Sequence, residues 1–188
     1  MTWRRCARSA RLIAVAFGVA ACTAPEIQTK EAHASEEFQF SRKRHKINDQ
    51  IAGKTIHFTD ASHGTQVEYF AENGTAMLWY PGNRVGVPSL WKVTDHGRDT
   101  GNYSICFMYP SKSYNPVTKQ HGGEWECRHV FAFSIAIDAI HPGDPYGLSD
   151  GKIPLRLPKN VSLSPEEVAQ MAGKTNDLTY VWRRGKTK

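Results

Sequence analysis

Several chemically reactive side chains lie close together in the stretch Gly122–Phe131, with the sequence GGEWECRHVF: Glu124, Glu126, Cys127, Arg128 and His129. A free Cys127 thiolate with a base held beside it could act as a nucleophile. Cys127 and His129 could also contribute to a metal site, but a structural zinc site needs more closely paired ligands than this chain has. No metal or cofactor is therefore expected. A disulfide bond is the third interpretation of Cys127, and it depends on the compartment in which the chain folds.

The N-terminus predicts export from the cytosol. A positively charged head without acids is followed by the apolar run Leu12–Ala21, which is typical of a secretory signal. The run is too short to span a bilayer, which takes roughly 20 apolar residues. It ends in Val-Ala-Ala-Cys22, which resembles the lipobox of bacterial lipoproteins, where the cysteine is lipidated and becomes the first residue. We expect lipidation of Cys22, with an ordinary secretory signal, cleaved near Ala34, as the alternative.

The positive charge of the chain lies mainly at its ends. The full sequence carries 24 basic and 18 acidic residues. Residues 1–21 hold four arginines and no acid, so the rest carries 20 basic and 18 acidic residues, a net charge of +2. The basic clusters Ser41–Lys46 and Arg183–Lys188 are typical of solvated ends, or could touch anionic lipid or polysaccharide. A nucleic-acid partner is not expected.

Export leaves Cys106 and Cys127 as the one pair inside the expected domain, since Cys6 is lost with the signal and Cys22 is the expected anchor. In an oxidising compartment such a pair predicts a disulfide. Both cysteines lie in alternating segments, and in the second of them Trp125, Cys127, Phe131 and Phe133 share one face of the expected strand. Two neighbouring strands would let the thiols meet. Closing a loop of about 22 residues would stabilise the fold by roughly 3 kcal/mol.

The composition divides the chain into four parts. Residues 1–21 are predicted to be a signal peptide, and residues 22–40, which are polar and small, a flexible tether. Residues 41–182 form a single β-rich domain, followed by a basic tail at residues 183–188. Helices are expected at Ser41–Ala52 and after Ser164, which can cap a helix that begins at Pro165.

Strand patterns dominate between these two helices. Asn73-Gly74 lies between two strand-like runs and is a strong hairpin signal. Further strands are expected at Thr55–Phe58, Ser89–Thr94, Ser134–Ile140 and Leu178–Trp182, although the apolar spacing of Ser134–Ile140 also suits a short helix. Successive short strands favour a mainly β fold, namely a small antiparallel β-barrel or sandwich with a short N-terminal and a short C-terminal helix. The large core residues should be Trp79, Tyr80, Trp91, Tyr103, Phe107, Trp125, Phe131 and Phe133.

Familiar catalytic motifs are missing from the sequence. The tetrapeptide AGKT occurs twice, at residues 52–55 and 172–175, but neither copy has the earlier glycine of a phosphate-binding loop. The segment Asp138–Gly151 does not match the spacing of a calcium loop. There is no serine elbow and no dinucleotide fingerprint, so no catalytic residue is assigned.

From Ile51 to Leu157 the chain carries short motifs in a fixed order: GKT, VEYFAENGTAMLWYPG, SLWKVT, ICFMYP, GEWECRHVF and GDPYGLSDG. This order resembles a family of small secreted or lipidated proteins, mainly from alphaproteobacteria, that is catalogued as a domain of unknown function. The resemblance implies a compact β-rich envelope domain, and its two-cysteine pattern supports the disulfide. It implies no catalytic residue.

These features predict a non-catalytic lipoprotein of the bacterial cell envelope that faces the periplasm and binds another envelope component, either a protein or a polysaccharide. The membrane would be reached through the lipid on Cys22; a soluble periplasmic or secreted protein is the alternative location. One alternative function is a small β-barrel that binds an apolar ligand in a cavity lined by aromatic residues. A second is a small hydrolase or lyase in which the fold brings His129 or His141 to a carboxylate.

Overall fold

The computed structural model describes residues 37–95, 102–176 and 178–185. These residues belong to one compact unit, Ala34–Lys188. The expected signal peptide, Cys22 and most of the expected tether lie outside the described residues.

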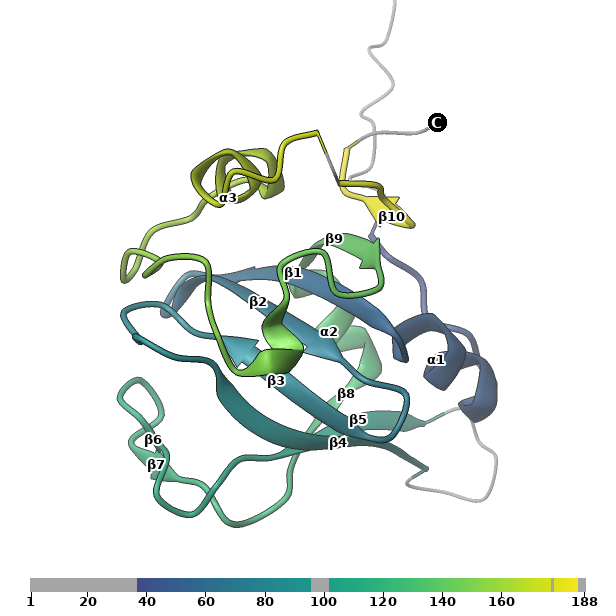
Figure 1. The fold of residues 1–188 in the computed structure, drawn as a ribbon. Coiled ribbons are helices and arrows are strands. Elements are labelled where there is room, and N and C mark those ends of the chain that lie inside the picture. Colours follow the sequence, from purple (N-terminus) through teal and green to yellow (C-terminus); the bar gives the residue numbers. More distant parts are fainter. Residues whose placement is uncertain (1–36, 96–101, 177, 186–188) are drawn as a thin grey trace, which may run out of the picture. The chain divides into compact units, whose positions relative to one another are not determined.

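Eight strands form one antiparallel sheet that curves into a half-barrel (Figure 1). Their order across the sheet is β10-β9-β1-β2-β3-β4-β5-β8. The strands are β1 (Lys54–Asp60), β2 (Gly64–Phe70), β3 (Thr75–Trp79), β4 (Val87–Asp95), β5 (Tyr103–Met108), β8 (Glu126–His129), β9 (Ile137–Pro142) and β10 (Trp182–Arg183). A separate small hairpin consists of β6 (Tyr114–Asn115) and β7 (Gln120–His121). The expected mainly β fold is therefore confirmed.

Both expected helices are present. Helix α1 (Arg44–Ile51) precedes the sheet, and α3 (Pro165–Met171) lies between β9 and β10 in the chain. Ser164 and Glu167 form a reciprocal capping box at the start of α3, with proline at its first turn, as the sequence indicates. A further helix, α2 (Val130–Ala136), and a 3-10 turn, η1 (Leu148–Asp150), complete the fold.

The sheet is covered on both faces, and α2 and η1 lie on opposite sides of it (Figure 1). Because side chains alternate along a strand, β1 sends Ile56 and Phe58 to the face covered by α1 and α2, which we call the α2 face. The neighbouring β2 sends Val67 to the other face, covered by η1 and α3, which we call the α3 face. The aromatic ring of Phe38 is also part of the α2-face core, ahead of the expected domain start at Ser41.

The chain after β8 differs from the expectation. We expected Trp125, Cys127, Phe131 and Phe133 to share the buried face of one strand, but the strand ends at His129 and α2 begins. The His129 Nδ1 atom accepts a hydrogen bond from the Phe131 backbone N–H and caps the helix. Helical periodicity then turns Phe133 into the core and leaves Phe131 58% exposed, while Trp125 on the edge is 37% exposed.

Two expected strands are also shorter than the sequence indicates. The segment Ser134–Ile140 is divided between α2 and β9. Of Leu178–Trp182, only Trp182 enters a strand, β10, where it pairs with Ile140 of β9.

A disulfide joins the edge strand β8 to the rest of the sheet. Cys106 of β5 and Cys127 of β8 lie directly opposite each other in the register, and their Sγ atoms are bonded. Cys106 is fully buried, whereas every residue of β8 is exposed. The covalent link therefore holds in place a short strand that has little packing of its own.

Replacing both cysteines in a Cys106→Ser/Cys127→Ser variant should lower the free energy of unfolding by about 3 kcal/mol, because the unfolded chain regains the entropy of an open loop. Urea unfolding with and without a reductant measures this loss. Reductant should shift the midpoint of the wild-type protein and leave the variant unchanged. Alkylation of both Cys106 and Cys127 in the native, unreduced protein would contradict the bond.

Candidate functional site

The α2 face of the sheet contains a cavity of about 630 Å3. Its floor is formed by residues of the strands, and Phe133 of α2 closes one side. The rim is formed by the turns after β1 and β3, by the β6–β7 hairpin and by β8. The apolar lining includes Phe58, Leu78, Phe107 and Phe133, and the ionisable lining consists of Asp60, His63, Glu68, Tyr80, Tyr109, Tyr114, Glu126, Arg128 and Lys159.

Glu68 is the ionisable group of the floor. It lies in the middle of β2, and its side chain is 0% exposed. The Ser89 hydroxyl of β4 donates a hydrogen bond of 3.1 Å to Glu68 Oε1, but Oε2 has no hydrogen-bond partner in the part of the chain that the structure describes. No Lys, Arg or His of the described residues forms an ion pair with this carboxylate.

Burial determines the charge of Glu68. Removal from water penalises the carboxylate and raises the pKa of Glu68 to about 8, although the hydrogen bond from Ser89 acts in the opposite direction. At neutral pH most molecules therefore carry a neutral carboxyl group here. An unpaired, buried polar oxygen is costly, and the cavity is the place from which a partner can reach it.

Two side chains of the rim hydrogen-bond to each other. The Nδ1 atom of His63 lies 2.7 Å from the Tyr80 hydroxyl oxygen. The Asp60 carboxylate accepts hydrogen bonds from the backbone N–H groups of Ser62 and His63, which fixes the turn that carries the imidazole. Burial lowers the pKa of His63, opposed by the negative charge of Asp60, so the ring is neutral at pH 7.

Tyr109 connects the floor to the rim. Burial raises the pKa of its phenol well above the usual range, and the charges of Glu68 and Glu126 add to this effect. Its hydroxyl is therefore a permanent hydrogen-bond donor within the cavity. The cavity thus combines an apolar floor with one carboxyl group and a polar rim, an arrangement suited to a molecule with both polar and apolar parts.

A second, more open hollow of about 580 Å3 lies over β3 and β4. Its lining contains Met77, Leu90 and Met108 but no Asp, Glu, Lys, Arg or His. Of these two hollows, the first is therefore the one lined by acidic and basic side chains that can bind a charge or move a proton.

The stretch that suggested chemistry in the sequence forms part of the cavity wall. Cys127 is held in the disulfide, so no thiolate is available there. Glu126, Cys127 and Arg128 line the cavity, whereas His129 caps α2. Within the described residues, no three His, Cys, Asp or Glu side chains lie close enough together to hold a metal ion.

The residue that the sequence did not single out is Glu68. A signal for it exists in GTQVEYF: Val67 and Tyr69 occupy one face of the strand, and Phe70 shows that the other face is apolar as well. An acid in a strand that is apolar on both faces is expected to be buried. Its position in a cavity could not be read from this pattern.

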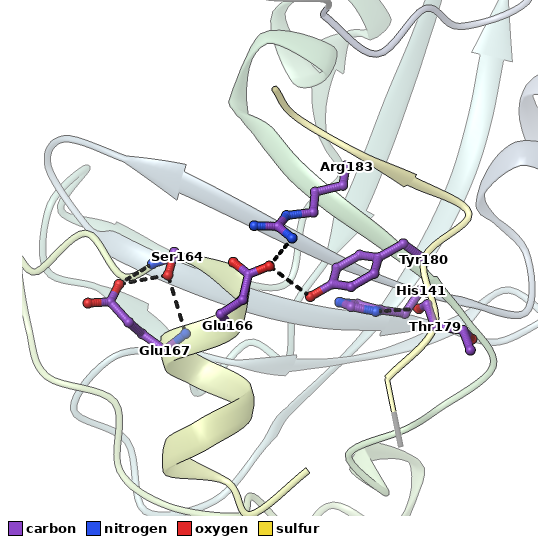
Figure 2. A network of polar contacts seen from close by, with 7 residues as sticks. All are labelled: His141, Ser164, Glu166, Glu167, Thr179, Tyr180 and Arg183. Atoms are coloured by element: carbon purple, nitrogen blue, oxygen red, sulfur yellow. Dashed lines mark hydrogen bonds and ion pairs between the residues drawn. The ribbon is translucent and has the colours of Figure 1, made fainter. Parts of the chain in front are cut away.

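A second polar cluster lies on the α3 face, around His141 of β9 (Figure 2). Its Nδ1 atom lies 2.8 Å from the Thr179 carbonyl oxygen, and the neighbouring Tyr180 hydroxyl donates to Glu166 of α3 at 3.4 Å. Arg183 forms an ion pair with the same carboxylate (Figure 2). Burial lowers the pKa of His141. The charge of the Glu166 carboxylate acts in the opposite direction, so His141 has a carboxylate near it, and this cluster joins α3 to β9 and β10.

No protein-family model, curated protein or solved structure matches this chain. In the described part of the chain, no helix has the length and apolar character needed to cross a membrane. Inference about function therefore depends on the cavity and on the N-terminal sequence.

Replacing Glu68 with glutamine should change how stability depends on pH. The carboxyl has a pKa of about 8 when folded against 4.5 ordinarily, so the folded state binds more protons than the unfolded state between these values. Wild-type stability should therefore fall as pH rises through this window and level off above pH 8. Glu68→Gln removes this loss and should be more stable at pH 8.5 by up to about 4 kcal/mol.

Urea unfolding between pH 4 and pH 9 measures this difference. The exposed Glu72, in the turn after the same strand, provides the control variant Glu72→Gln, which should keep the wild-type profile. Identical pH profiles for the two glutamine variants would contradict the raised pKa of Glu68.

Proposed function

We propose that this protein is a non-catalytic binding protein that holds a small amphiphilic molecule in the cavity on the α2 face. One observation carries the proposal: the fully buried Glu68 lines the cavity, and its Oε2 atom has no hydrogen-bond partner among the described residues. A ligand that reaches this oxygen would satisfy it. The binding energy would then offset a destabilisation that the unliganded fold must bear.

The size and lining of the cavity support this proposal. Small-molecule sites commonly enclose about 300 to 1,000 Å3, and this one measures about 630 Å3. Of the eight large residues expected in the core, Tyr80, Phe107 and Phe133 line it. This supports the β-barrel alternative from the sequence, with one change: Glu68 and the polar rim favour a ligand that carries a polar group as well as an apolar part.

The proposed location is still the bacterial cell envelope. Its support is the arginine-rich head, the short apolar run and the lipobox-like end at Cys22. A lipid on Cys22 would tether the binding domain to a membrane facing the periplasm, where it could meet another envelope protein or a polysaccharide. The ligand would then be taken up or presented near that membrane.

A Cys22→Ser variant tests the anchor. Expressed in a Gram-negative host, the wild-type protein should sediment with membranes and the variant should be soluble, because the acyl chains are lost. Cys6→Ser, which leaves the lipobox intact, should behave as the wild type. Membrane association of the Cys22→Ser protein equal to that of the wild type would contradict the lipid anchor.

The cavity can be tested with a pair of substitutions in the turn between β6 and β7. Thr118 lines the cavity, and its neighbour Val117, which is also exposed, does not. Both backbone N–H groups donate to Asn115 Oδ1, so neither substitution removes a side-chain contact of the turn. Thr118→Trp should obstruct the cavity, while Val117→Trp should leave it open.

The probe is the neutral apolar dye N-phenyl-1-naphthylamine, whose fluorescence rises in apolar sites. Wild type and Val117→Trp should bind one dye per protein with similar affinity, and Thr118→Trp should bind at least tenfold more weakly. Absence of saturable binding to the wild type, or equal affinity for all three proteins, would contradict a ligand-binding cavity.

A further inference from the structure

The charge of the ligand can be inferred from what surrounds Glu68. Among the described residues, its carboxyl group has one hydrogen-bond partner, the Ser89 hydroxyl, and no cation forms an ion pair with it. A buried carboxylate is stable only beside a positive charge or several hydrogen-bond donors. The described part of the fold provides one donor, and Oε2 of this cavity-lining residue has no hydrogen-bond partner there.

Aromatic rings line the same cavity as this carboxyl group. The rings of Phe107 and Phe133 have centroids 5.9 Å apart, and Phe58 lies 5.8 Å from Phe133. Tyr109 stacks on Phe107 at 6.3 Å. The faces of aromatic rings attract cations, and such rings around a carboxylate are a common way of holding an ammonium group.

The charges of the rim residues balance and therefore do not repel a cation. Two acids, Asp60 and Glu126, balance two bases, Arg128 and Lys159. His63 is neutral at pH 7 because burial lowers its pKa. The phenols of Tyr80, Tyr109 and Tyr114 complete the ionisable lining, and burial raises the pKa of the first two. The sign of the charge favoured deep in the cavity is therefore decided by Glu68.

We infer that the ligand is an organic cation, an ammonium group carried on an apolar chain, whose head pairs with Glu68 Oε2 among the aromatic rings. This inference rests on the proposed binding function. The apolar chain would lie along Leu78 and Val87, which line the same cavity.

Binding of a cation must be coupled to release of a proton. The free protein holds Glu68 mostly protonated below a pKa of about 8, and only the carboxylate can pair with the ammonium group. Affinity should therefore rise about tenfold for each pH unit between pH 6 and pH 7.5 and level off above pH 8.5. At pH 7, roughly 0.9 proton should be released for each cation bound.

Octylammonium and octanol are suitable probes, since they share an apolar chain and differ in the charge of the head group. Their affinities follow from displacement of N-phenyl-1-naphthylamine, and proton release follows from calorimetry in two buffers of different ionisation enthalpy. At pH 8.5, octylammonium should bind the wild type at least tenfold more tightly than octanol. Glu68→Gln should bind both compounds alike and release no proton.

Two further variants test whether the effect belongs to Glu68. Glu72→Gln removes an exposed acid that does not line the cavity and should keep the preference for octylammonium. Ser89→Ala removes the hydrogen bond that lowers the pKa of Glu68, so the pH at which affinity levels off should move upward. Because this variant keeps the carboxyl group, it reports on the site even if glutamine perturbs the fold.

The possible results separate an error in the inferred charge of the ligand from an error in the proposed binding function. If the dye binds and octanol equals or exceeds octylammonium at pH 8.5, the cation is wrong while the binding function stands. An octylammonium preference that persists in Glu68→Gln also overturns the pairing of the cation with Glu68. If the dye itself does not bind the wild type, the proposed function fails first.

Discussion

The burial of β2 on both of its faces is the constraint on which the site depends. Antiparallel sheets often leave one face to water, but here α1 and α2 cover one face and η1 and α3 cover the other. Every side chain of β2 must therefore enter one of two interiors. Val67 enters the α3-face core, whereas Glu68 enters the cavity beneath α2. A carboxyl group at position 68 of this strand is therefore removed from bulk water.

Such a position has a cost, and the surrounding fold does little to reduce it. Ser89 supplies one hydrogen bond and no counter-ion is present among the described residues, so the carboxyl group stays mostly neutral at pH 7. A glutamine could make the same hydrogen bond without any ionisation penalty. Groups that reduce stability in this way are typical of functional sites. The disulfide between Cys106 and Cys127 acts in the opposite direction, because it secures β8, the exposed wall of the same cavity.

Local signals predict much of the fold. Asn73-Gly74 marks the β2–β3 turn, and the Ser164 capping box marks the start of α3, because both depend on residues close together in the chain. The strand predicted over Trp125–Phe133 is too long because it ends at His129, where the His129 cap and the packing of Phe133 favour the helix. The cysteine pair is predictable from export and alternation. The cavity is not predictable in this way, because Glu68 and Phe133 line it from separate elements and Ser89 reaches Glu68 from a third.

Glu68 is a buried carboxyl group without a counter-ion among the described residues, and the proposed ligand would supply one. Its pKa can be measured directly by carbon-13 NMR of the side-chain carboxyl, assigned with the Glu68→Gln variant. In the free protein the titration midpoint should lie near 8, as burial predicts. Addition of octylammonium should move it downward, which would support pairing of the cation with Glu68. A midpoint near the ordinary 4.5 in the free protein would show that the carboxyl is already solvated or paired, and would contradict it.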